Sequence, residues 1–204
     1  YDNLKTETVC STIASYGSEA CLIFLLKRIK ELKENKLIEV LKQKIGFAKS
    51  NMMTCATVNN KNLNAAKVLW NFYKENLSKK ELLEILCEVG FLEKVARSSK
   101  SSEMIEFFWC EIENGMDKVE CIEFLKINIY EILKESILGN NEKSFTVLFE
   151  RVVCPYFELK EFIFKDLWYG ENLFQNLCRD GSPKMLILAI KKLRNVLTIE
   201  EFQN

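Results

Sequence analysis

The sequence predicts an all-α protein in which four to five stacked units, each of two to three helices, form a helical repeat solenoid. Three observations lead to this prediction. The 204 residues include only 7 Gly and 2 Pro, which leaves little material for the tight turns of a β-rich fold. Apolar residues recur at the spacing of helix faces. Three kinds of marker residue also recur together, with a period of about 40 residues.

The repeat is defined by positions that keep their spacing from one unit to the next. A bulky apolar residue recurs at intervals of 39, 40 and 41 residues, at Trp70, Trp109, Phe149 and Ile190. A small or turn-forming residue lies eight positions earlier in each unit, at Asn62, Ser101, Asn141 and Ser182. A glutamate lies about eleven positions later, at Glu81, Glu120, Glu161 and Glu201. Gly17, Leu25 and Glu39 form a partial, more widely spaced copy near the N-terminus.

A longer helix is predicted around each bulky apolar residue. Apolar positions follow the i, i+3, i+4, i+7 pattern over residues 65–73, 104–112, 145–153 and 185–193. These apolar faces are broader than the face of a helix that lies on a surface. We therefore expect each longer helix to pack between neighbours on both sides, with Trp70 and Trp109 in the core.

A short capped helix is predicted after each longer helix, and a further helix before it. Three residue pairs have the spacing of a capping box, in which each side chain accepts from the other residue's amide: Ser78 with Glu81, Asp117 with Glu120, and Thr198 with Glu201. Short helices are expected to follow, for example over residues 82–87 and 121–125. The preceding helices are predicted over residues 47–57, 91–98, 130–138 and 173–178, each followed by a polar break.

We expect residues 1–204 to form a single helical-repeat domain, with units at about 8–35, 36–80, 81–119, 120–160 and 161–204. The chain begins with Tyr1 rather than Met, which indicates a fragment of a longer protein. The longest strictly apolar run, residues 20–26, is far shorter than the roughly 18 residues that a membrane span needs. No membrane span is therefore expected.

In residues 64–83 a Leu-Trp pair is followed by Ser-Lys-Lys-Glu-Leu-Leu. This stretch resembles a divergent, elongated ankyrin repeat of about 40 residues. Ser101-Ser102-Glu103 and Asn140-Asn141-Glu142 are similar to the turn into the second helix of that family, where Gly-Asn-x-Glu is usual. Asp180-Gly181-Ser182 matches more loosely, and the resemblance covers about residues 10–202 in four or five units.

The chain also departs from the ankyrin pattern. The Thr-Pro-Leu-His box is absent from every unit, and the usual Asp-x-x-Gly finger is missing. The resemblance therefore implies a helical stack whose β-hairpin fingers are lost or replaced by the short extra helix. HEAT-like and tetratricopeptide-like stacks are the alternatives, although the tetratricopeptide period of about 34 residues fits poorly.

The composition argues against several kinds of chemistry. Basic and acidic residues number 29 each, whereas a nucleic-acid-binding protein usually has a basic excess. The absence of His excludes Ser-His and Cys-His pairs and His-ligated zinc. The sequence has no GxGxxG or GxxxxGK(S/T) loop, and no two cysteines lie closer than eleven residues. We therefore predict no enzyme activity, no cofactor and no metal site.

Several of the eight cysteines lie inside apolar helical stretches, where a free thiol behaves as a small buried hydrophobe. We expect reduced cysteines in an intracellular protein, either cytoplasmic or nuclear. Secretion as an effector stays an alternative.

Helical repeat stacks expose long, slightly curved surfaces that commonly bind proteins, so the sequence predicts a non-catalytic protein–protein interaction domain. The resemblance implies a binding groove lined by the first helix of each unit and the junction before it. The candidate contacts are therefore Phe91, Lys94, Tyr130, Lys134, Trp168 and Tyr169. The alternatives are a nucleic-acid-binding solenoid and a helical accessory domain of an effector or enzyme whose active region lies outside this fragment.

Overall fold

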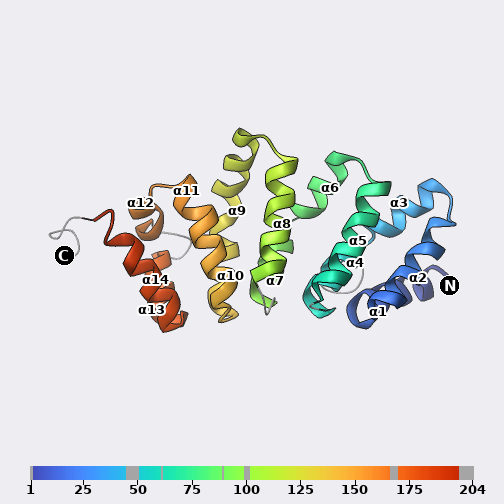
Figure 1. Ribbon diagram of the computed structural model, residues 1–204, viewed down its shortest axis with the longest axis horizontal. Coiled ribbons are helices and arrows are strands. Elements are labelled where there is room, and N and C mark those ends of the chain that lie inside the picture. The colour runs from blue at the N-terminus through green and yellow to red at the C-terminus, as the bar shows by residue number, and fades with distance from the viewer. Residues whose placement is uncertain are drawn as a thin grey trace. The chain divides into compact units, whose positions relative to one another are not determined.

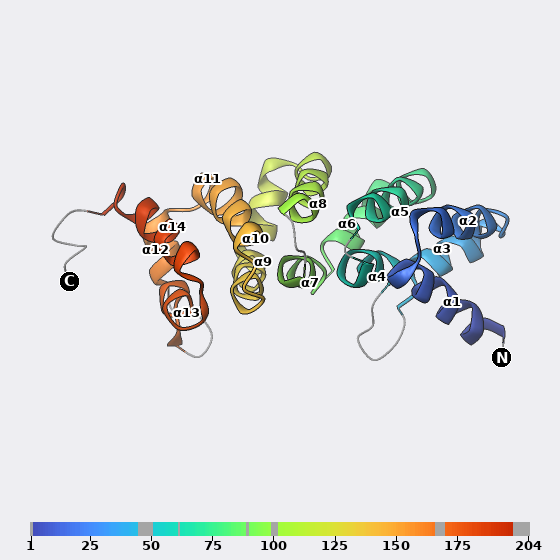
Figure 2. The same cartoon turned by 60° about the horizontal axis from the view of Figure 1, so that its bottom comes forward.

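The computed structural model describes residues 2–44, 51–60, 62–88, 90–98, 102–165 and 170–197. These residues form helices joined by turns and contain no β-strand, which confirms the predicted all-α class. No helix within them is both long enough and apolar enough to cross a membrane. The chain divides into two compact parts, Tyr1–Val95 and Ala96–Asn204, which we describe in turn (Figures 1 and 2).

The first part consists of helices that pack in successive pairs. Its elements are α1 (Asp2–Tyr16), α2 (Glu19–Lys30), α3 (Glu34–Lys42), α4 (Met52–Cys55), the π-helical turn η1 (Ala56–Asn60), α5 (Leu63–Asn76), α6 (Lys79–Leu86) and the start of α7 (Phe91–Ser98). Helix α1 packs against α4 and η1, and α2 packs against α5, as both views show (Figures 1 and 2).

A glycine and a serine set the turn from α1 to α2. The amide of Gly17 donates to the carbonyl of Ile13 over 2.8 Å. A Cβ at position 17 would lie 2.5 Å from that same oxygen, so a larger residue needs the backbone to shift. The Ser18 hydroxyl accepts from the amide of Cys21 and so caps the first turn of α2. These two residues end one helix and begin the next within a short segment.

The core of the first part is centred on α5. Trp70 is 1% exposed and Tyr73 is fully covered, so the predicted core position of Trp70 is confirmed. The Tyr73 hydroxyl donates to the carbonyl of Leu41 over 2.8 Å, which ties the C-terminal end of α3 to α5. Burial raises the pKa of Tyr73 far above its usual value, so this hydroxyl keeps its proton.

The second part also consists of helices joined by turns. After the end of α7 its elements are α8 (Ser102–Gly115), α9 (Lys118–Leu138), α10 (Glu142–Val147), the π-helical turn η2 (Leu148–Val153), α11 (Cys154–Tyr156), α12 (Leu159–Phe164), α13 (Leu173–Asp180) and α14 (Pro183–Leu193). Helix α10 packs against α8, α9 and α14, while α13 packs against α9, α12 and α14. Trp109 of α8 is 1% exposed, as predicted, and the rings of Phe145 and Phe149 stack 5.3 Å apart.

Helix α9 differs from the sequence prediction. We expected a short helix over residues 121–125 and a separate helix over residues 130–138, but one helix spans Lys118–Leu138 without a break. No Gly or Pro lies between the two predicted segments, so nothing in the sequence interrupts the backbone hydrogen bonds. Asn side chains often favour turns, but the Asn128 side chain donates to the Phe124 carbonyl one turn earlier in the same helix.

Two of the three predicted capping boxes are confirmed. Ser78 with Glu81 begins α6, and Asp117 with Glu120 begins α9. The third predicted pair, Thr198 with Glu201, lies outside the described residues. A further box, in which Asn172 and Gln175 begin α13, was not predicted. Of the helix predicted over residues 47–57, residues 51–57 are described, and α4 begins after the cap Asn51.

Candidate binding surfaces

Helix α7 carries two of the predicted partner contacts, and the structure separates them by burial. The Phe91 side chain is 2% exposed and therefore packs in the core instead of lying at the surface. Lys94, one turn later, is half-buried. The apolar spacing that predicted a helix here also placed Phe91 on its covered face, and only Lys94 of the pair stays a candidate contact.

Tyr130 of α9 holds three elements of the second part together. Its hydroxyl accepts from the amide of Leu173 at the start of α13 over 2.8 Å and donates to the carbonyl of Phe162 in α12 over 3.3 Å. The Tyr130 ring also lies 5.1 Å from the Phe162 ring. Burial raises the pKa of Tyr130 to about 12, so the hydroxyl is protonated at neutral pH. These contacts give Tyr130 a structural role at the junction of α9, α12 and α13.

Lys134 lies one turn after Tyr130 on α9 and is more accessible. Its side chain is 39% exposed, and its ammonium group lies 3.4 Å from the Glu131 carboxylate. Lys134 therefore stays a candidate contact. The last two predicted contacts, Trp168 and Tyr169, lie outside the described residues.

The cysteines carry free thiols in this structure. Cys10, Cys55 and Cys121 are buried, and burial raises the pKa of each thiol above its usual value. These thiols are therefore protonated and poor nucleophiles at neutral pH. Within the described ranges, no group of three or more His, Cys, Asp or Glu side chains is placed to hold a metal ion.

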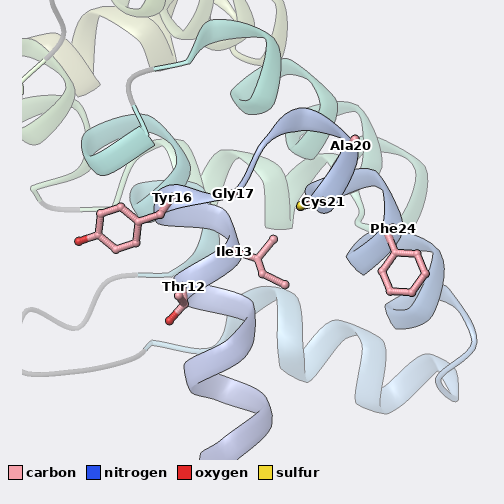
Figure 3. A pocket seen from close by; sticks show the side chains of 7 residues that line it. All are labelled: Thr12, Ile13, Tyr16, Gly17, Ala20, Cys21 and Phe24. Carbon is pink, nitrogen blue, oxygen red and sulfur yellow. The ribbon is translucent and has the colours of Figure 1, made fainter.

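An open apolar surface lies at the turn between α1 and α2 in the first part. We call it the α1–α2 groove, and it has a volume of about 520 Å³. Figure 3 shows Ile13 projecting between the two helices, with Tyr16 and Phe24 at opposite ends. The residues that line it are Thr12, Ile13, Tyr16, Gly17, Ala20, Cys21 and Phe24.

Two aromatic side chains of this groove are exposed to solvent. Tyr16 is 79% exposed and Phe24 is 61% exposed. The guanidinium of Arg28 lies 5.4 Å from the centre of the Phe24 ring, so a cation borders the apolar surface. Large exposed aromatic residues are common anchors of protein interfaces because they bury much apolar area at a small cost in side-chain entropy.

A second, smaller groove lies between α2 and α5. We call it the α2–α5 groove; its volume is about 310 Å³. Apolar side chains from the two helices meet in it, among them Ile23 and Leu26 of α2 and Val68 and Phe72 of α5. Charged side chains border it, and Lys30 of α2 pairs with Glu75 of α5 over 3.3 Å.

The α1–α2 groove was not predicted from the sequence, although one signal for it was present. Residues 20–26 form the longest apolar run, so the N-terminal half of α2 is apolar on all sides. Leu22 and Phe24 point in nearly opposite directions because an α-helix has 3.6 residues per turn. Leu22 is fully buried and Phe24 is exposed. A helix that is apolar all round usually packs against neighbours on more than one side.

Neither the protein-family models nor the curated proteins nor the solved structures include a match to this chain.

Proposed function

We propose that this chain is a non-catalytic protein-binding domain that binds a partner protein through the surface of a stack of helical repeats. The observation that carries the proposal is the α1–α2 groove, an apolar surface with two exposed aromatic side chains. Apolar patches of this kind on a folded domain mark interaction sites, because their exposure to water is unfavourable until a partner covers them.

The proposed stack is supported by the spacing of the contacts within each part. Among the described residues, several side-chain hydrogen bonds join residues that are 32 to 45 positions apart, which is about one predicted repeat. In a solenoid each unit contacts only its neighbours, so long-range contacts are expected at one repeat length. The spacing favours successive units that resemble elongated ankyrin repeats, with α6 and α12 in place of the β-hairpin fingers.

Photo-crosslinking in a lysate of the source cells tests the proposed function. The photoreactive amino acid p-benzoylphenylalanine replaces Phe24 in the groove, or Ile127 in a control chain. Ile127 is a suitable control because it is an apolar residue of α9 that is 77% exposed and does not line the groove. A third chain carries the same amino acid at Lys134, the candidate contact on α9.

We expect a protein to be crosslinked from position 24 and not from position 127. A protein crosslinked from position 134 alone would show that the chain binds a protein through α9 instead of through the groove. Crosslinks that are equally strong at all three positions, or only to nuclease-sensitive material, would contradict the proposal.

A further inference from the structure

We propose that the π-helical turn η2 is a conformational device that absorbs one extra residue in the helical segment formed by α10, η2 and α11. Removal of one exposed residue of the turn, Glu150 or Arg151, should convert the segment into a regular α-helix. This property is independent of the proposed function. Its support comes from a comparison of the segment with α5, α8 and α14.

The first half of the segment has the same register as the other three helices. Positions are counted from one bulky apolar residue in each helix, namely Trp70, Trp109, Phe149 and Ile190. The residues five positions earlier are all buried: Ala65, Met104, Ser144 and Met185. The residues one position earlier are also buried: Leu69, Phe108, Leu148 and Ala189. Up to the bulky residue, the four helices therefore match position by position.

The backbone hydrogen bond at the C-terminal end shows that the registers then differ. In α5, α8 and α14, the amide seven residues after the bulky residue donates to the carbonyl three residues after it. These bonds join Leu77 to Tyr73, Met116 to Ile112, and Leu197 to Leu193. The corresponding bond in the segment with η2 runs from the Phe157 amide to the Val153 carbonyl, eight and four residues after Phe149. This segment is one residue longer between equivalent points.

The conformation at the helix end supports the equivalence of Phe157 and Leu77. Both residues are extended, with φ −131° and ψ 148° for Phe157 and φ −120° and ψ 148° for Leu77. Each is followed directly by the residue that precedes the next helix, Glu158 before α12 and Ser78 before α6. The extra residue therefore lies inside the helical segment and not in the turn after it.

Burial places the extra residue within η2. Val152 and Val153 are fully buried, three and four residues after Phe149. In α5 the buried pair Phe72 and Tyr73 lies two and three residues after the bulky residue. The residues four positions after the bulky residue in the other three helices are charged and exposed: Lys74, Glu113 and Arg194. The apolar face is thus displaced by one residue after Phe149.

A π-helical turn is the geometry that allows this displacement. Its hydrogen bonds join residues i and i+5, whereas those of an α-helix join residues i and i+4, so one turn holds one more residue. The six residues of η2, Leu148–Val153, span the point where the registers separate. The apolar faces before and after the turn can then stay on the same side of the segment.

The exposed residues of the turn contribute little to its stability. Glu150 pairs with Lys192 of α14 over 3.1 Å, and Arg151 lies 4.0 Å from Glu106 of α8. The side chains of Glu150 and Arg151 are 42% and 46% exposed. Ion pairs at this exposure are weak because water screens them. Removal of either residue should therefore act mainly through the helix register.

The test deletes single residues from the full 204-residue chain and measures Tm. One variant lacks Arg151 and a second lacks Glu150; each brings Val152 and Val153 to the positions that Phe72 and Tyr73 hold in α5. The matched control lacks Glu111 of α8, a helix without a π turn. Arg151→Ala, Glu150→Ala and Glu111→Ala measure the loss of each side chain alone.

We expect the Tm of each η2 deletion to lie within about 3 °C of the matching alanine variant. Deletion of Glu111 should lower Tm by about 10 °C or more relative to Glu111→Ala, because it moves the Glu113 carboxylate to the buried position of Ile112. Amide hydrogen exchange followed by mass spectrometry should show unchanged protection of α12 (Leu159–Phe164) in both η2 deletions.

Three outcomes would overturn the inference. The first is a Tm loss for the η2 deletions as large as that for the Glu111 deletion. The second is a loss of exchange protection in α12, which would show that the deletion shifts the chain after the turn. The third is a Glu111 deletion that is tolerated as well as the η2 deletions, since the tolerance would then be unrelated to the π turn.

Discussion

The side-chain amide of Asn141 donates to the carbonyl of Ala96 over 2.8 Å, although the two residues are 45 positions apart. The Oδ1 atom of the same side chain accepts from the amide of Ser144 and so caps α10. Asn141 is almost fully buried. One side chain therefore begins a helix and also satisfies a carbonyl of α7 that water cannot reach.

Asn141→Ala should destabilise the protein by about 2–3 kcal/mol in urea unfolding. Loss of a helix cap costs about 1 kcal/mol, and the unpaired Ala96 carbonyl adds about 1–2 kcal/mol. Asn62→Ala is the matched control, because Asn62 is an exposed cap of α5 that accepts from the amides of Asn64 and Ala65 in its own first turn. The control should lose about 1 kcal/mol. Equal losses for the two variants would contradict a bridging role for Asn141.

Trp109 should give the largest loss among single core truncations in the second part. Trp109→Ala should cost about 3–5 kcal/mol, because it leaves a large cavity in a close-packed core. The Trp109 indole N–H is buried and has no hydrogen-bond partner among the described residues. Trp109→Phe removes that donor and keeps most of the ring, so it should cost only about 1–2 kcal/mol. A loss below about 1 kcal/mol for Trp109→Ala in chemical denaturation would place this ring at the surface.

Tyr130→Phe should destabilise the junction of α9, α12 and α13 by about 1–2 kcal/mol, since the Leu173 amide loses its acceptor. The folded-state pKa of Tyr130, about 12, is above the usual value of 10. Its contribution to stability is therefore complete below pH 10 and decreases as the pH rises towards 12. The difference in Tm between the wild-type chain and Tyr130→Phe should shrink over that range. A difference that is constant up to pH 12 would contradict this assignment.

Glu81 should make stability depend on pH at the acidic end. Hydrogen bonds from Lys42 and then from Ser78 lower its folded-state pKa to about 2, from a usual value of 4.5. The contribution of the Glu81 carboxylate to the free energy of unfolding is present above pH 4.5 and is lost as the pH falls towards 2. Glu81→Gln keeps an acceptor for the capping box but removes the charge.

The Tm difference between the wild-type chain and Glu81→Gln should therefore be largest near pH 6 and decline below pH 4.5. If the Tm difference for Glu81→Gln does not change with pH, the ion pair with Lys42 is not the cause of that difference.

Local signals in the sequence were sufficient for most of the helices. The capping pairs Ser78 with Glu81 and Asp117 with Glu120 predicted where two helices begin, because a cap acts within a single turn. Apolar spacing predicted that Trp70 and Trp109 are buried. The break expected within α9 was wrong, because a change in apolar pattern does not end a helix when no residue disrupts its hydrogen bonds.

The candidate site was less predictable. Tyr130 was chosen as a partner contact, but its hydroxyl bonds to backbone groups of residues 162 and 173, a pairing that no local pattern encodes. Phe91 was chosen for its place on a first helix, and its burial depends on which neighbours cover it. The α1–α2 groove was missed for the same reason.

The sequence by itself determined the helices, because caps, glycines and apolar spacing act within a few residues. It also determined which faces are apolar. Only the tertiary structure decided which of those faces are covered, because burial depends on contacts between residues that are distant in the chain. Leu22 and Phe24 are equally apolar in the sequence, yet the packing of the first part leaves one buried and the other exposed.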